Sequence, residues 1–132
     1  MKIGYEAKRI YHNASGLGNY GRNLIRALAT SYPKNEYHLY NPKTAKIPFG
    51  EFLPSVIEEK PSIPNPLYSN IWRQRLMSDR VKKDGIEIFH GLAQELPLGL
   101  SKRGVKSVLT VHDLIFMRYP QLYNFIDRKI YI

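Results

Sequence analysis

The sequence predicts an α/β fold in which a mainly parallel sheet carries helices on both faces. Candidate elements follow one another in the order strand, helix, strand, loop, helix, strand, strand, helix. Two short apolar runs, residues 86–89 and 106–111, are bounded by turn signals, which suits strands at the centre of a parallel sheet. The length of 132 residues fits one domain. Ligands of such sheets bind beyond the carboxyl ends of the strands.

The first half of the chain holds two predicted strands around one predicted helix. Residues 1–10 predict a strand followed by a loop, and residues 11–19 are rich in turn-forming residues. A helix is predicted next, because apolar residues recur at helical spacing, and Pro33 ends it. These apolar residues are Tyr20, Leu24, Ile25, Leu28 and Ala29. Residues 36–40 predict the second strand.

The second half begins with an irregular segment. Residues 41–66 carry six of the nine prolines, and one short strand is predicted there near residues 55–58. Residues 67–83 predict a strongly basic helix. Its basic residues are Arg73, Arg75, Arg80, Lys82 and Lys83. The tail, residues 123–132, has helical spacing but no capping signal, so the chain is expected to stop in mid-helix.

Composition narrows the classes of function. The net charge of +9 favours an anionic partner, which is nucleic acid, a phosphorylated substrate or acidic lipid. The lack of cysteine excludes a thiolate zinc site, and neither an HExxH motif nor an i, i+4 histidine pair indicates a metal. No nucleic-acid-binding motif is present, so nucleic acid is not an expected partner. Without a membrane-length apolar run or a signal-peptide core, the protein is expected to be soluble and cytoplasmic.

A glycine-rich loop precedes the first predicted helix and offers a site for an anion. Gly16, Gly18 and Gly21 match the G-x-G-x-x-G pattern in letters, with Asn19 beside them. Glycine lets backbone N–H groups approach an anion, and a helix N-terminus adds about half a positive charge. The loop is not a Walker A motif, and it starts late after the first strand for a dinucleotide fingerprint. A tight turn with close helix packing is the alternative.

Two predicted strands end in histidines. His90 follows residues 86–89, and His112 with Asp113 lies at the end of residues 106–111. A histidine at the carboxyl end of a strand can exchange hydrogen bonds with a substrate hydroxyl near neutral pH. The alternative is a buried histidine bonded to the backbone, with Asp113 as a helix cap. Because parallel strands share one carboxyl edge, the glycine loop and both histidines are expected to converge there.

Several short segments, taken in their order and spacing, carry a family resemblance. They are residues 15–28 (SGLGNYGRNLIRAL), residues 88–91 (IFHG) with residues 96–98 (LPL), and residues 108–116 (VLTVHDLIF) followed by Tyr119-Pro120 and Asp127-Arg128. Together they resemble the GT-B glycosyltransferases of family 4. Within that family the chain is most similar to bacterial mannosyltransferase-like enzymes of cell-surface polysaccharide assembly.

The resemblance implies a two-domain enzyme that moves a sugar from a nucleotide sugar to an acceptor hydroxyl. Such transfer retains the anomeric configuration and needs no metal and no cofactor. Residues 1–132 would form the N-terminal, acceptor-side, Rossmann-like domain, truncated before the C-terminal nucleotide-sugar domain. The chain alone is therefore expected to be inactive in transfer. The acceptor is expected to be a saccharide or lipid-linked molecule that residues 41–67 recognise.

The same resemblance assigns roles to individual residues. Gly16 matches the glycine whose amide approaches the donor diphosphate, and Gly18 and Asn19 lie beside it. His112 matches the histidine that lines the active centre, and Asp113 follows it in the same motif. His90 matches a position at the cleft edge and is expected to contact the acceptor.

Two other hypotheses stay open. The chain could be a stand-alone nucleotide- or phosphosugar-binding module with a Rossmann-like fold and no catalysis. The basic helix, with Trp72 on it, could dock on anionic lipid at the periphery of the inner membrane. A solvated face is the usual meaning of such a run of charges, and it is the alternative for this helix.

Overall fold

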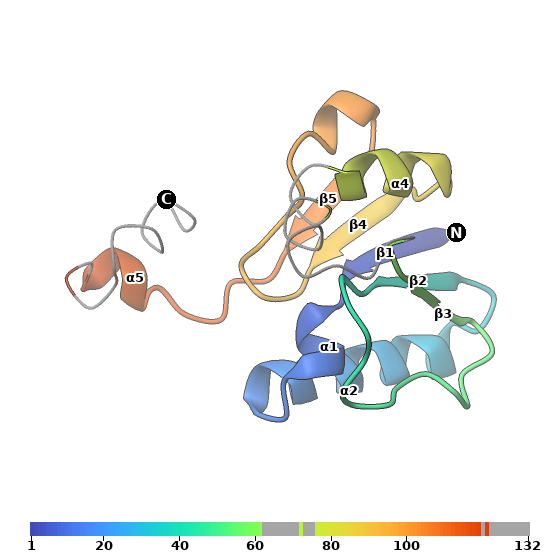
Figure 1. Ribbon diagram of the computed structural model, residues 1–132, viewed down its shortest axis with the longest axis horizontal. Coiled ribbons are helices and arrows are strands. Elements are labelled where there is room, and N and C mark those ends of the chain that lie inside the picture. Colours follow the sequence, from blue (N-terminus) through green and yellow to red (C-terminus); the bar gives the residue numbers. More distant parts are fainter. Residues whose placement is uncertain (62–71, 73–75, 120, 122–132) are drawn as a thin grey trace.

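The computed structural model describes residues 1–61, 72, 76–119 and 121, and its centre is a five-stranded, all-parallel sheet (Figure 1). The strand order is β3-β2-β1-β4-β5, which matches the first five strands of a doubly wound Rossmann-like sheet. The strands are β1 (Lys2–Glu6), β2 (Glu36–Tyr40), β3 (Val56–Glu59), β4 (Ile88–Gly91) and β5 (Lys106–Leu109). The prediction of an α/β fold is confirmed.

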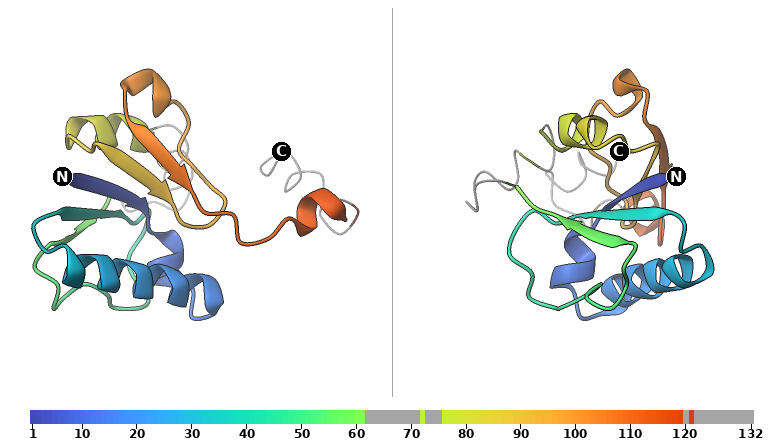
Figure 2. Two further views of the ribbon diagram at one scale, coloured as in Figure 1. Left: turned by 180° about the vertical axis from the view of Figure 1, so that it is seen from behind. Right: turned by 90° about the vertical axis from the view of Figure 1, so that its right-hand side faces the viewer.

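Helices cover both faces of this sheet, as predicted. One face carries α1 (Lys8–His12) and α2 (Gly16–Ser31), and the other carries α4 (Met77–Lys83), as Figures 1 and 2 show. A separate core lies on each face. The core under α2 contains Tyr5, Ala7, Ile10, Tyr11, Ile25, Ala29, Tyr37, Leu39 and Leu92. The core under α4 contains Tyr40, Trp72, Met77, Val81, Ile86, Phe89, Leu100 and Val105. Alternate residues of β2 therefore enter opposite cores, as the pleat of a strand requires.

The predicted first helix is present as α2, and it begins within the glycine loop itself. Its C-terminus is where Pro33 predicts it: the N–H of Tyr32 donates to Leu28 O, and the helix ends at Ser31. The hydroxyl of Tyr37 lies 2.9 Å from Leu28 O and 3.0 Å from Tyr32 O, so it supplies a further donor to the backbone carbonyls at this end. The strand prediction at residues 36–40 is also confirmed.

The prediction of a loop after the first strand is wrong, because residues 8–12 form α1. Ile10 and Tyr11 are buried on this helix, and the N–H of Ala7 donates to Tyr40 O at 3.0 Å. The guanidinium of Arg22, on α2, donates to the carbonyls of Ile10 and Asn13 at the end of α1. Long-range contacts thus stabilise five residues that are too few to show a helical period.

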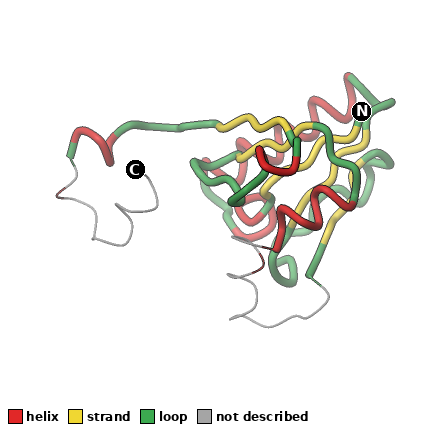
Figure 3. Tube along the Cα trace, turned by 90° about the horizontal axis from the view of Figure 1, so that it is seen from above, coloured by secondary structure: helices red, strands yellow, loops and turns green. Residues whose placement is uncertain are grey.

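The prediction that the two later strands are central and buried is wrong for β5. β5 is an edge strand, and all four of its residues are exposed. Beyond it the chain extends away from the sheet to a short helix, α5 (Ile115–Arg118), as Figure 3 shows. β4 begins at Ile88 instead of Ile86 and includes His90 and Gly91.

Other predictions agree in part with the structure or fall beyond it. The strand near residues 55–58 is present one residue later, as β3, and a 3-10 turn, η2 (Ser101–Arg103), precedes β5. Of the predicted basic helix only α4, Trp72 and Leu76 are described, and residues 67–71, 73–75 and 123–132 lie outside the described residues. Among the helices that are described, none has the length and apolar character needed to cross a bilayer.

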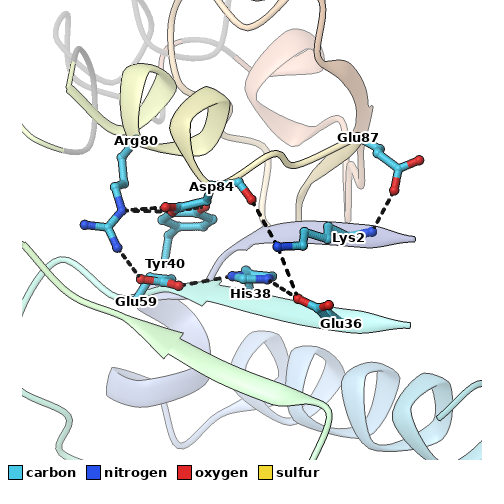
Figure 4. A network of polar contacts seen from close by, with 8 residues as sticks. All are labelled: Lys2, Glu36, His38, Tyr40, Glu59, Arg80, Asp84 and Glu87. Carbon is cyan, nitrogen blue, oxygen red and sulfur yellow. Dashed lines mark hydrogen bonds and ion pairs between the residues drawn. The ribbon is translucent and has the colours of Figure 1, made fainter. Parts of the chain in front are cut away.

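A network of charged side chains ties α4 to the sheet (Figure 4). The guanidinium of Arg80 lies 2.9 Å from carboxylate oxygens of Glu59, on β3, and of Asp84. Glu59 also contacts Nδ1 of the buried His38 at 3.1 Å, and the hydroxyl of Tyr40 donates to Asp84 at 2.8 Å. Arg80 is therefore engaged within the fold and is not a free charge of a solvated helix.

Candidate functional site

Four side chains meet at the carboxyl edge of the sheet, where ligands bind in folds of this class. His90 lies on β4, Thr110 directly follows β5, His112 lies two residues further on, and Tyr20 comes from α2. The strand order reverses between β1 and β4, so β4 lies at the topological switch point. These contacts bring the ends of β4 and β5 together with Tyr20 of α2, whereas the position of the glycine loop itself at this edge stays a prediction.

His90 is half-buried and belongs to a hydrogen-bonded pair with Thr110. Its Nε2 lies 2.8 Å from Thr110 Oγ1, and its ring centroid lies 5.7 Å from that of Tyr5 on the central strand. Burial lowers the pKa of His90, and burial likewise raises the pKa of the neighbouring Tyr5. Both side chains are therefore neutral near pH 7. A neutral imidazole can donate at one nitrogen and accept at the other.

His112 is exposed at the same edge, and a hydrogen-bond partner determines which of its ring nitrogens carries the proton. Nε2 lies 2.8 Å from the backbone oxygen of Leu92. Because a carbonyl oxygen only accepts, Nε2 must carry the proton of the neutral ring. Nδ1 is then the nitrogen with a lone pair, and the described part of the chain shows no hydrogen bond to it.

Tyr20 and Thr110 are the residues of this edge that the sequence interpretation missed. The Tyr20 hydroxyl lies 3.3 Å from Thr110 Oγ1. The centroids of the Tyr20 and His112 rings are 4.9 Å apart, and the angle between the ring planes is 88°. Tyr20 fits the apolar spacing of the helix and so looked like a core residue, yet it is 37% exposed. Thr110 is the one polar residue inside the run Val108-Leu109-Thr110-Val111, and that signal could have identified it.

In the glycine loop, the backbone of Gly16 is accessible, whereas Gly18 and Asn19 make contacts within the fold. A side-chain carbon at Gly16 would meet nothing within 4 Å, so a ligand can approach its backbone closely. Gly18 is buried, and its N–H lies 3.3 Å from Asn13 Oδ1, which also accepts from the N–H of Ser15 at 2.9 Å. Asn19 accepts a hydrogen bond from Arg22 at 2.7 Å. Gly16 is therefore the open position at the N-terminus of α2.

Asp113 is exposed and makes contacts within its own turn. Its Oδ1 accepts from the N–H of Ile115 at 3.1 Å, a contact within the turn before α5, whose N-cap residue is Leu114. Its backbone oxygen accepts from Gln94 Nε2 at 3.1 Å, and Gln94 adopts a left-handed φ of 62°. The N–H of Gln94 in turn donates to Thr110 O at 3.1 Å. Residues 92–95 thus connect the end of β4 to the segment that carries His112.

A groove of about 370 Å³ lies on another side of α2, against the irregular segment that follows β2. Arg26 and Thr30 line it from the helix, and residues 48–53 line it from the loop. The Arg26 guanidinium lies 5.7 Å from the centre of the Phe49 ring, and Phe52 is 94% exposed beside it. Aromatic faces flanked by a guanidinium and a hydroxyl suit a ligand with both apolar and polar surfaces.

The described residues contain no cluster of three or more His, Asp or Glu side chains arranged to hold a metal. Comparison of the chain with protein-family models, with curated proteins and with solved structures gives no match. The fold and the edge geometry together define an α/β protein with a Rossmann-like parallel sheet and a histidine-bearing edge at the switch point.

Proposed function

We propose that the chain is the acceptor-side domain of a retaining, metal-independent glycosyltransferase of family 4 with a GT-B fold. The enzyme would move a sugar, with mannose as the first candidate, from a nucleotide sugar to an acceptor hydroxyl in surface polysaccharide assembly. One observation carries the proposal: α2 brings Tyr20 against Thr110 and His112 at the edge that also holds His90. Three segments singled out from sequence thereby border one ligand edge.

The expected chemistry follows from the groups at this edge. Gly16 offers an unobstructed backbone at a helix N-terminus, where the helix dipole favours a diphosphate. His90, kept neutral by burial, and exposed His112 can exchange hydrogen bonds with sugar hydroxyls. Stabilising the leaving diphosphate requires further cations around it, and a half-open site leaves each contact weakened by water. The chain by itself is therefore expected to bind weakly and to show no turnover.

The acceptor is proposed to be a saccharide or a lipid-linked saccharide. The groove beside Phe49 supports this, since it lies in the irregular segment after β2 and combines aromatic faces with polar groups. A cytoplasmic enzyme with a peripheral contact to the inner membrane would suit a lipid-linked acceptor. Neutralising Arg73 and Arg75 would weaken salt-dependent binding to anionic vesicles if the basic helix makes that contact.

The test is a titration of the chain with ligands, monitored by two-dimensional NMR. Methyl α-mannoside, GDP-mannose and UDP-glucose are the probes, and His112→Ala is compared with His12→Ala. His12 is a matched control because it lies on α1 and contacts Asn41 at 3.0 Å. The proposal expects shifts around His90 and His112 with the mannoside, lost in His112→Ala and kept in the control. Shifts confined to other parts of the fold would contradict it.

The stand-alone nucleotide-binding module is the second candidate, and the open N-terminus of α2 at Gly16 favours it. The same titration separates the two functions. Saturable, micromolar binding of nucleotide sugars to the chain alone, centred on Gly16, would support the module. Turnover of GDP-mannose by the chain above a His112→Ala control would overturn the expectation of inactivity.

A further inference from the structure

Tyr20 touches two different parts of the edge at once. Its hydroxyl lies 3.3 Å from Thr110 Oγ1, which in turn lies 2.8 Å from His90 Nε2. Its ring lies 4.9 Å from the His112 ring at 88°, an edge-to-face arrangement of the kind that aromatic pairs prefer. Tyr20 thus contacts two residues that follow β5, and Thr110 connects it in turn to His90 on β4.

The His112 ring has two fixed contacts, and together they define its orientation. The Leu92 carbonyl accepts from Nε2 at 2.8 Å, and because Nε2 lies off the Cβ–Cγ axis this hydrogen bond opposes rotation of the ring about that axis. The Tyr20 ring, nearly perpendicular to that of His112, blocks this rotation from one side. An exposed histidine without such a contact samples both tautomers and several rotamers.

The hydroxyl of Tyr20 contacts Thr110, whose side chain and backbone make further hydrogen bonds at this edge. Thr110 Oγ1 lies within hydrogen-bond distance of both His90 and Tyr20, and a hydroxyl, with one proton and two lone pairs, can bond to both at once. The backbone of Thr110 is fixed by its N–H, which donates to Gly91 O at 2.9 Å, and by its oxygen, which accepts from Gln94. Thr110 therefore connects the Tyr20 hydroxyl to the backbone at the end of β4.

We propose that Tyr20 is a positioning residue, which holds the His112 ring so that Nδ1 is the nitrogen that accepts a hydrogen bond from a ligand hydroxyl. The nature of the ligand, a sugar hydroxyl, rests on the proposed function. The orientation of His112 rests only on its contacts with Leu92 and Tyr20. Tyr20 acts through His112, and Nδ1 makes the contact with the hydroxyl.

The first experiment needs no ligand. Long-range proton–nitrogen NMR at pH 8 assigns the tautomer of His112 in the unmodified chain and in Tyr20→Phe, Tyr20→Leu and Tyr20→Ala. The proposal expects the Nε2–H tautomer in the unmodified chain and in Tyr20→Phe, and a mixture of tautomers in Tyr20→Ala. Tyr20→Leu keeps apolar bulk at this position and gives the result if Tyr20→Ala unfolds. An Nδ1–H tautomer in the unmodified chain, or unchanged spectra in the Leu and Ala variants, would overturn the proposal.

The second experiment measures the affinity for methyl α-mannoside. Removing the ring is expected to weaken binding about threefold to tenfold, the range of one aromatic pair, while Tyr20→Phe changes it about twofold or less. Tyr32→Ala is the matched control, because Tyr32 is an exposed tyrosine at the other end of the same helix. Equal affinities in Tyr20→Leu and the unmodified chain would contradict the positioning role. If the unmodified chain binds no mannoside, the proposed function fails, and the tautomer still decides the role of Tyr20.

Discussion

Replacing Gly18 by alanine tests how tightly α1 and α2 are packed together. A side-chain carbon at this position would overlap the carbonyl oxygen of Asn13 and lie 2.9 Å from that of Arg9. Both neighbours are backbone atoms, so the overlap is relieved only if the end of α1 moves. That movement would also stretch the bonds from Arg22 to the carbonyls of Ile10 and Asn13.

The expected cost of Gly18→Ala follows from these contacts. Overpacking costs about 1–3 kcal/mol, and weakening hydrogen bonds from a charged donor adds about 1.5 kcal/mol or more. The better helix propensity of alanine returns about 1 kcal/mol. We therefore expect the free energy of unfolding to fall by about 2.5 kcal/mol, a large part of the stability of a small domain. The midpoint of thermal unfolding should fall by about 10 °C.

Gly16→Ala is the matched control in the same turn of chain. A side-chain carbon there meets nothing within 4 Å, and Gly16 does not have a left-handed φ. Alanine should leave stability unchanged or raise it by about 0.5–1 kcal/mol. Urea denaturation followed by far-ultraviolet circular dichroism measures both variants. A Gly18→Ala chain within about 0.5 kcal/mol of the unmodified one would refute the packing argument, since such a change is ordinary for a surface site.

Three further predictions concern other parts of the fold. Burial lowers the pKa of His90, so the unfolded chain binds more protons below about pH 6.5; stability should fall on acidification toward pH 5, and His90→Gln should flatten that slope in urea denaturation. Tyr40→Phe removes the donor to Asp84 and should lower the free energy of unfolding by about 1 kcal/mol; an unchanged urea midpoint would deny that bond any role. Phe52→Ala, at an exposed ring of the groove, should change stability by less than about 0.5 kcal/mol yet weaken mannotriose binding in the NMR titration; equal affinity would exclude this groove as an acceptor site.

The sequence predicted the elements whose signals are local. α2 shows an apolar period and a terminating proline, and β2 is a compact run of aromatic and apolar residues, so both were predicted close to their true bounds. α1 was missed because its five residues are stabilised by Arg22, twelve residues beyond Ile10, and by burial under the sheet. Non-local contacts of this kind leave no periodic trace in a sequence.

β5 shows a second limit of local signals. The run at residues 106–111 is apolar and β-branched, which predicts a strand correctly but does not say what lies on either side of it. In the structure it forms the edge of the sheet, with Val108 and Leu109 exposed. Apolar composition reports a tendency to be buried, whereas the position of a strand depends on the order of all the others.

The sequence predicts the candidate site residues that lie at strand ends, but not the residue that a helix contributes. His90 and His112 follow from one rule, because carboxyl ends of parallel strands share an edge. Tyr20 obeys the helical spacing of core residues, and only its contacts with Thr110 and His112 reveal that it lies at the carboxyl edge of the sheet. Sequence spacing identifies the face of a helix but not the distance of that face from a neighbouring strand.

The three glycines of the G-x-G-x-x-G pattern have different surroundings, and these surroundings differ from those in a dinucleotide-binding loop. In the dinucleotide fingerprint the first strand runs directly into the glycine turn, so the phosphates sit at the end of that strand. Here α1 lies between β1 and α2. Gly18 permits contact with the end of α1, and a side-chain carbon at Gly21 would lie 2.9 Å from Ile10 and 3.4 Å from Leu92. The first turns of α2 therefore pack against α1 and against Leu92, which follows β4, so Gly18 and Gly21 serve helix packing and not the phosphate contacts of a dinucleotide loop.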